Sequence, residues 1–292
     1  MDATLATAAE GRAGSAHIRV LQSRWLLAFV AIELVLVFAP TARWLYDRWT
    51  MGIWYNGHGL FIPPLVACFS WVSLRKLKSA PADVSAWGFV FLAPALAALA
   101  LDAGIHSQIL SAVALVIALP GLSLLFLGIT RTKAIDFALA FSAFMLPIPL
   151  AITEHLHFVL RQIGTAGAAF VLPAIGVRVF AEGTNLHLAN GSLFVGDGCS
   201  GFSTLYASLA VAALTAYACN YTRGRVLTLL LAMPTAIASN VIRIVILAVL
   251  VHQMGLPVLD TWMHPASGML TFVISLPLIF WIGSPRPEPA TT

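Results

Sequence analysis

The chain has 292 residues, of which 60% are hydrophobic and 10% are charged, with a formal net charge of +4. Soluble domains are about 45 to 50% apolar and about 25% charged, so this composition excludes an ordinary soluble protein. Three cysteines are too few to staple a chain of this length, which excludes a disulfide-rich secreted scaffold. The basic residues stand singly or in pairs between apolar runs, so they indicate membrane topology and no nucleic-acid partner.

Apolar runs long enough to cross a bilayer recur along the chain. A helix needs about 20 such residues to span the hydrocarbon core. The sequence predicts an all-α polytopic membrane protein with about eight transmembrane helices in a single membrane-embedded domain, residues 25–283. The predicted segments are residues 25–44, 60–74, 86–101, 109–129, 135–152, 199–219, 226–251 and 264–282.

The stretch between the fifth and sixth segments behaves differently. Residues 158–176 are apolar but contain Arg161, Gly164, Gly167 and Pro173. We expect an interfacial or re-entrant helix there and no ninth crossing.

The distribution of Lys and Arg predicts the orientation, because these residues are retained in cytoplasmic loops. With both termini in the cytoplasm, the inner segments carry eleven basic residues and the outer segments four. A ninth crossing would move Arg223 and Arg225 outside. We expect residues 1–24 to be a cytoplasmic segment before a retained anchor, and residues 284–292 to be a disordered cytoplasmic tail.

Residues 177–197 alternate apolar and polar side chains around Glu182-Gly183 and Asn190-Gly191. Asn-Gly is a strong hairpin signal, so we expect two or three short strands on the outer face. This β element leads into Gly198-Cys199-Ser200-Gly201, where the sixth segment begins. Cys199 is therefore expected at a helix N-terminus, where the positive dipole end favours a thiolate.

Two further polar side chains fall near the outer ends of the last two segments. Arg243 lies eight residues from the outer end of its segment, where a charge in the membrane needs a partner. It either reaches Cys199 or pairs with Glu33 of the first segment. Asn240 shares its helix face. His264 opens the last segment, and Gly268, one turn later, leaves a bare patch on the same face.

The chain resembles the exosortase/archaeosortase family of membrane transpeptidases in five motifs that occur in order. The resemblance covers most of residues 45–283. The motifs are Tyr55-Asn56-Gly57-His58-Gly59, Phe144-Met145-Leu146-Pro147-Ile148-Pro149, Gly198-Cys199-Ser200-Gly201, Pro234 through Asn240-Val241-Ile242-Arg243-Ile244, and His264-Pro265-Ala266-Ser267-Gly268.

This resemblance implies a site and a reaction. Cys199, Arg243 and His264 would be the catalytic residues, with Asn240, Ser200, Gly201 and Gly268 in support. The cysteine would form an acyl-enzyme with a substrate peptide, Arg243 would stabilise developing negative charge, and His264 would transfer protons. No cofactor or metal is implied.

The resemblance also implies the partners and the location. The substrates would be exported proteins with a C-terminal sorting signal, made of a Pro-Glu-Pro-like motif, a transmembrane helix and a basic tail. The enzyme would lie in the cell inner membrane among lipids, with its site on the extracytoplasmic side, and would pass the product to an acceptor. The run from Gly201 to Tyr206 departs from the commoner family pattern, which leaves the subtype and its sorting motif open.

The sequence is also compatible with two other hypotheses about function. Asp197, His252, Asp260 and His264 could bind a metal ion in a membrane hydrolase, although their spacing lacks the His-Glu-x-x-His pattern. Alternatively, Arg243 and Glu33 could form an intramembrane pathway in a transporter or assembly scaffold.

Overall fold

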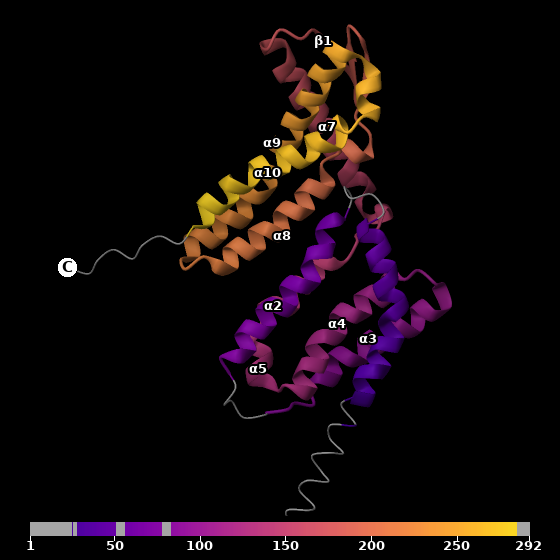
Figure 1. Cartoon of the computed structure of the whole chain (residues 1–292), viewed down its shortest axis with the longest axis vertical. Helices are drawn as coiled ribbons and strands as arrows, with labels where there is room; N and C mark the ends of the chain where they lie inside the picture. The colour runs from indigo at the N-terminus through magenta and orange to yellow at the C-terminus, as the bar shows by residue number, and fades with distance from the viewer. Residues whose placement is uncertain (1–24, 26–27, 51–55, 78–82, 285–292) are drawn as a thin grey trace, which may run out of the picture.

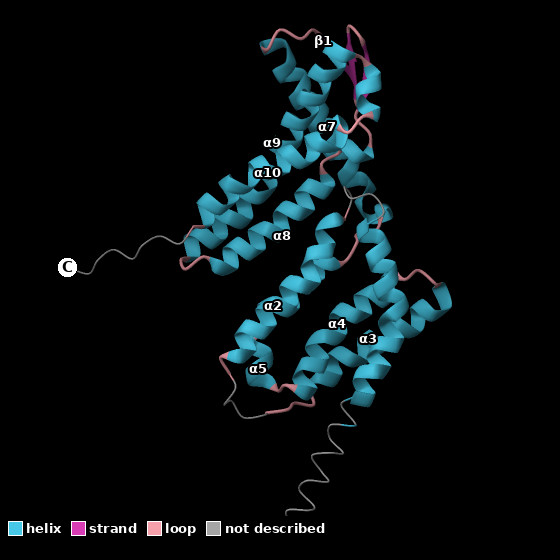
Figure 2. Ribbon diagram, in the orientation of Figure 1, coloured by secondary structure: helices cyan, strands magenta, loops and turns pink. Residues whose placement is uncertain are grey.

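The computed structural model describes residues 25, 28–50, 56–77 and 83–284, which are mostly helical (Figures 1 and 2). The predicted segment 1–24 and residues 285–292 of the predicted tail lie outside the described residues. After a first helix, Ala28–Thr50, the helical elements are η1 (Gly57–Phe61), α2 (Ile62–Arg75), α3 (Gly88–Ile105), α4 (Ile109–Phe126), α5 (Ile129–Ala134), α6 (Asp136–Phe141), η2 (Ser142–Met145), α7 (Leu150–Ala174), η3 (Asp197–Cys199), α8 (Phe202–Ala218), α9 (Thr222–Met254), η4 (Leu256–Asp260) and α10 (Met263–Gly283).

Seven of the described helices are long and apolar enough to cross a membrane, which confirms an all-α polytopic membrane protein. They match seven of the eight predicted segments within a few residues. Their bounds are Ala28–Thr50, Gly57–Arg75, Gly88–Ile105, Ile109–Phe126, Asp197–Ala218, Thr222–Met254 and Met263–Gly283.

The prediction of one continuous span over residues 135–152 is wrong. α6 and η2 form a short apolar helix, Asp136–Met145, and the chain is extended at Leu146, with ψ 124°, before α7 begins. Pro147 and Pro149 cause the break, because proline lacks an N–H group and disfavours the helical conformation of the residue before it. The Tyr206 hydroxyl donates a hydrogen bond to the freed Leu146 carbonyl at 3.2 Å.

The stretch expected to be an interfacial or re-entrant helix is the C-terminal part of α7, a helix of 25 residues that is not among the seven candidate spans. Its glycines do not interrupt the helix because they pack against α9. A Cβ atom on Gly164 would lie 2.6 Å from Ile244 Cδ1, and one on Gly167 would lie 2.8 Å from Val241 Cγ2. Small residues therefore let α7 approach α9 closely.

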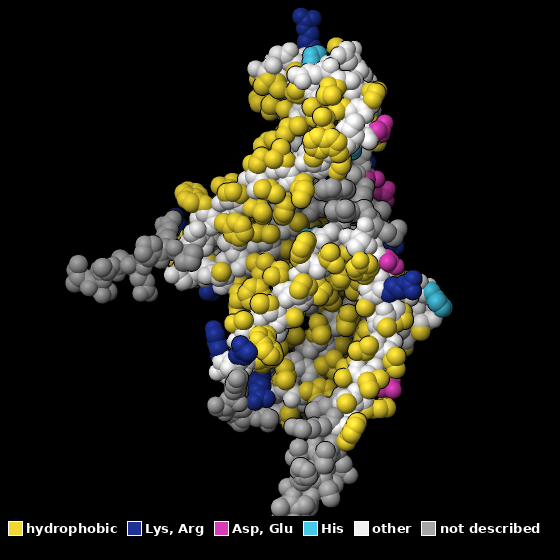
Figure 3. Space-filling model, viewed as in Figure 1, with side chains coloured by type: hydrophobic (Ala, Val, Ile, Leu, Met, Phe, Trp, Pro, Cys, Tyr) yellow, Lys and Arg dark blue, Asp and Glu magenta, His cyan; other side chains and the backbone are white. Residues whose placement is uncertain are grey.

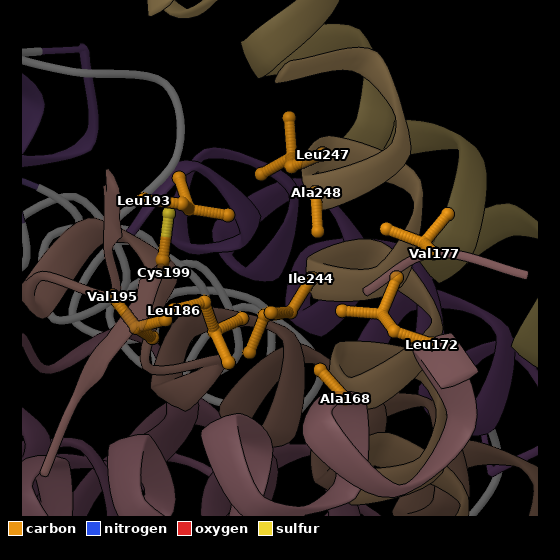
Figure 4. Close-up of a cluster of buried hydrophobic side chains, with 10 residues drawn as sticks. All are labelled: Ala168, Leu172, Val177, Leu186, Leu193, Val195, Cys199, Ile244, Leu247 and Ala248. Carbon is orange, nitrogen blue, oxygen red and sulfur yellow. The ribbon is translucent and has the colours of Figure 1, made fainter. Parts of the chain in front are cut away.

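The predicted β element forms a three-stranded antiparallel sheet in the order β1 (Val179–Glu182), β2 (Asn185–Leu188) and β3 (Gly191–Phe194). Two-residue turns join the strands, since Glu182 pairs with Asn185 and Leu188 with Gly191. Leu186 and Leu193 are buried and pack in a cluster with α7 and α9. Figure 4 shows this cluster, whose members are Ala168, Leu172, Val177, Leu186, Leu193, Val195, Cys199, Ile244, Leu247 and Ala248.

The last three long helices, α8, α9 and α10, pack on one another as an antiparallel group (Figure 1). At one end, the C-terminus of α10 meets the connection between α8 and α9, where the Tyr221 hydroxyl donates to the Ile282 carbonyl at 3.0 Å. The start of α8, the end of α9 and the start of α10 therefore lie at the opposite end. The predicted site residues all belong to that end.

Hydrophobic side chains cover much of the helical surface in the space-filling view (Figure 3). Many large ones are exposed, among them Val35, Phe89 and Leu230. A surface of this kind suits a hydrocarbon solvent and is unusual in water. Lys and Arg side chains gather near the ends of α2 and α5, where the sequence has Arg75, Arg131 and Lys133.

Candidate active site

Residues 197–201 form a tight loop, here called the cysteine loop, that joins the sheet to α8. Cys199 ends the single turn η3, and α8 begins at Phe202, so the thiol lies at a helix N-terminus as expected. Gly201 has φ +82°, which side chains other than glycine rarely adopt. A Cβ atom there would also lie 2.4 Å from Asn240 Cγ. Both constraints require glycine at this position.

Side chains of helix α9 hold the cysteine loop by donating hydrogen bonds to the carbonyl groups of the loop. Asn240 Nδ2 donates to the carbonyl oxygens of Cys199 and Ser200, at 3.1 and 3.0 Å. Arg243 Nη1 donates to the carbonyl oxygen of Gly198 at 3.0 Å. Asn240 and Arg243 are three residues apart and share one face of α9, so a single helix face fixes three successive peptide groups.

The thiol of Cys199 meets the imidazole of His264 at the start of α10. Sγ lies 3.3 Å from Nε2, and Nδ1 of the same ring lies 3.2 Å from the carbonyl oxygen of Leu259. A carbonyl oxygen can only accept, so Nδ1 carries the proton of the neutral ring. Nε2 is then the acceptor, and it faces the thiol. The pair has the geometry of a nucleophile with its general base.

Arg243 is only 6% exposed, and no carboxylate of the described residues forms an ion pair with it. Its Nε atom is buried without a hydrogen-bond partner. The predicted alternative, a pair with Glu33, is wrong, because Glu33 is exposed on the first helix. A Cβ atom on Gly268 would lie 3.2 Å from Arg243 Cζ, so the bare patch on α10 accommodates the guanidinium group.

A groove of about 720 Å³ opens beside Arg243, between α2 and the first helix on one side and α8 and α10 on the other. Its walls are mainly apolar. Along α8 the lining residues include Ser203, Ala207, Ala210 and Leu214, which recur at helical spacing. Gly268 and Arg243 lie at the same groove, so it leads to the candidate site.

His58, at the start of the second predicted span, also lines this groove. Its ring packs edge to face against Tyr206 with centroids 4.7 Å apart, and its Nε2 atom is buried without a hydrogen-bond partner. The motif around His58 therefore lies at the same end of the molecule as Cys199, although the two are far apart in sequence.

Asp197, His252, Asp260 and His264, the ligands in the metal-hydrolase hypothesis, do not form a metal site. Among the described residues, no group of three or more His, Cys, Asp or Glu side chains is placed to hold a metal ion. Instead, His264 contacts Cys199, and Asp197 pairs with Arg161.

Two residues of α7 that lie outside the five family motifs contact the cysteine loop. His157 Nδ1 lies 2.8 Å from Ser200 Oγ, and Arg161 Nη1 lies 2.8 Å from Asp197 Oδ1. Their i, i+4 spacing was the available signal, since it places both on one helix face. Nothing local showed which segment this face would meet.

The family model of the transmembrane exosortases matches residues 49–281 of the chain. No curated protein matches the chain, and no solved structure does. The match covers most of the chain, including α8, α9 and α10 with the cysteine loop. The chain therefore belongs to the transmembrane exosortase family, and it is a multi-pass membrane transpeptidase of the exosortase type.

Proposed function

We propose that this protein cleaves the C-terminal sorting signal of exported proteins through a Cys199 thioester and transfers the released acyl group to an acceptor nucleophile. The observation that carries the proposal is the 3.3 Å contact between Cys199 Sγ and His264 Nε2, made by side chains 65 residues apart in sequence. The contact lies at the end of the bundle where Arg243 and the groove are also found.

The first half of the reaction forms the acyl-enzyme. His264 Nε2 takes the thiol proton, and the sulfur of Cys199 forms a bond to the carbonyl carbon of the scissile peptide. The imidazolium then gives this proton to the leaving amine as the carbon–nitrogen bond breaks. In the second half, His264 takes a proton from the acceptor, which attacks the thioester and releases the thiolate.

Arg243 has N–H donors that are free to bind the negatively charged intermediates. A guanidinium group has five N–H donors, and one of them is used on the Gly198 carbonyl. Arg243 is buried and forms no ion pair with a carboxylate of the described residues. Its positive charge is therefore available to stabilise the thiolate or the oxyanion of the tetrahedral intermediate.

The groove suits the transmembrane helix of the sorting signal. From Ser203 to Leu214 it follows α8 for about 16 Å, at about 1.5 Å per residue. Small residues such as Ala207, Ala210 and Gly268 in its walls permit close helix approach. A helix docked there would bring the chain at its outer end to Arg243 and Cys199.

The orientation follows from the charges at the two ends of the bundle. Arg75, Arg131 and Lys133 lie at the ends of α2 and α5, away from the cysteine loop. The short helix Asp136–Met145 runs from α5 to contact η1 near His58, so it adds an eighth passage to the seven long helices. By the retention of basic residues in the cytoplasm, the candidate site then faces the extracytoplasmic side of the inner membrane, and both termini are cytoplasmic.

The test is to express the protein together with candidate substrates that carry a C-terminal tag, and to follow loss of the tag. Wild-type protein should release it, whereas Cys199→Ser should accumulate the uncut precursor. Cys68→Ser should cleave normally, because Cys68 is an exposed thiol on α2 that does not line the groove. Cleavage by Cys199→Ser at the wild-type rate would overturn the thiol mechanism.

The same assay separates the two other readings. A thiol enzyme keeps its activity in EDTA and loses it to an alkylating reagent, whereas a metal hydrolase shows the reverse. A transporter or scaffold would retain its function after Cys199→Ala.

A further inference from the structure

The cysteine loop is held on a second side, by α7. His157 is 3% exposed and approaches Ser200, while Arg161, one turn later, pairs with Asp197. These contacts reach the two residues on either side of the Gly198-Cys199 pair. The four side chains come from segments about 40 residues apart, so the contacts exist only in the folded protein.

The direction of the hydrogen bonds follows from the single proton of Ser200. Its hydroxyl group donates to the Asp197 carbonyl at 2.8 Å and accepts from the Phe202 N–H at 3.3 Å. Since this proton is committed, His157 Nδ1 must donate to Ser200 Oγ. The imidazole thus extends a chain of hydrogen bonds from α7 through Ser200 to the carbonyl group of Asp197, two residues before Cys199.

The contacts from α9 and those from α7 hold different parts of the cysteine loop. Asn240 and Arg243 hold three carbonyl groups from one side of the loop. The contacts from α7 hold the side chains of Ser200 and Asp197. The Cys199 side chain itself is hydrogen-bonded to His264, so the position of the loop determines whether Sγ meets Nε2.

We propose that His157 and Arg161 are positioning residues, which fix the cysteine loop so that Cys199 Sγ stays within reach of His264 Nε2. This inference rests on the proposed function and adds to it the part played by α7. A misplacement of about 1 Å in a reacting group costs on the order of 100-fold in rate. The effect is therefore expected in kcat, with KM unchanged, because neither residue lines the groove.

The central variants are His157→Leu, which removes the donor, and His157→Asn, whose amide nitrogen can take the place of Nδ1. His155→Leu is the matched control, because His155 is exposed on the same helix two residues away. We expect His157→Leu to lower kcat by about 10 to 100-fold with KM within about twofold. His157→Asn should recover most of the loss, and His155→Leu should behave as wild type.

A second readout needs no peptide substrate. The rate at which iodoacetamide alkylates Cys199 is measured against pH in purified protein that carries Cys68→Ser and Cys219→Ser. If His264 draws the thiol proton only while the loop is held, His157→Leu should move this profile to higher pH, and His157→Asn should restore it. A merely structural contact would leave the profile of the folded protein in place.

Asp197→Asn covers the case in which His157→Leu fails to fold. The Asp197 side chain is 54% exposed, so the substitution has little effect on folding, but it replaces the ion pair with Arg161 by a weaker hydrogen bond to a neutral amide oxygen. It should lower kcat by a few-fold and shift the alkylation profile in the same direction. Wild-type kcat and profile in Asp197→Asn, or in a folded His157→Leu, would overturn the inference.

The two proposals fail in different ways. If Cys199→Ser cleaves normally, the thiol mechanism is lost, whereas the alkylation profiles still report whether α7 positions the loop. If Cys199→Ser is inactive but the α7 variants match wild type in both readouts, only the positioning role is lost.

Discussion

Arg243 Nη1 lies 3.0 Å from the carbonyl oxygen of Gly198, so the guanidinium group is anchored to the peptide directly before Cys199. This contact restrains the loop and ties the guanidinium group to the backbone next to Cys199. Arg243 is held in a membrane helix by a backbone carbonyl and by the space over Gly268, with no carboxylate partner among the described residues.

Replacement of Arg243 by Lys keeps the positive charge but removes the planar fork of donors. A lysine cannot hold Gly198 and an oxyanion at once with the same geometry. We expect the rate of substrate cleavage to fall by about 100 to 1,000-fold, the cost of losing one oxyanion donor. Single-turnover cleavage measures this directly. Arg178→Lys, at an exposed position beside β1, is the control and should leave the rate unchanged.

Gly268→Ala tests whether the bare patch on α10 places the guanidinium group. The added Cβ would lie 3.2 Å from both Cζ and Nε of Arg243, so the side chain must shift. We expect kcat to fall by about tenfold or more, since positions in a site must hold to a fraction of an ångström. Gly104→Ala has open space around its Cβ and should leave activity intact. Equal kcat values for the two variants would contradict this role of Gly268.

Ala207→Phe places a large side chain in the groove against α8. If the helix of the sorting signal docks there, the substituted protein should bind it more weakly, and KM should rise by about tenfold or more. The alkylation rate of Cys199 should stay the same, because the small reagent does not need the groove. Ala238→Phe, exposed on α9, adds the same ring outside the groove. Cleavage kinetics of Ala207→Phe that equal those of Ala238→Phe would rule out this docking site.

The stability of the protein should depend on the charge state of His157. Burial lowers the pKa of His157, an effect that Arg161 reinforces and Asp197 opposes. The unfolded chain therefore takes up this proton at a higher pH, near the ordinary value of about 6.5. The stabilisation is fully present above that pH and is lost as the pH falls toward the lowered pKa of the folded protein.

The measurement is the unfolding temperature in detergent between about pH 7 and pH 5. Wild type should lose more stability on acidification than His157→Asn, which keeps the donor but does not titrate. Identical pH profiles for the two proteins would show that His157 is not the titrating group.

The sequence alone determined the class of protein and the residues of the candidate site, because both depend on local properties. Apolar runs of about 20 residues predict spans wherever they occur. The five motifs selected Cys199, Arg243 and His264. The short turns of the β element were equally visible, since a two-residue hairpin has its own composition.

The tertiary structure decided which segments meet. Pro147 and Pro149 are local signals for the end of a helix. They do not show where the next helix, α7, will pack. That depends on the fit of Gly164 and Gly167 against Ile244 and Val241 of α9. The pairing of His157 with Ser200 likewise joins residues separated by 43 positions. Such contacts depend on how whole helices pack. The sequence shows which residues share a helix face, but it does not show which segment that face will contact.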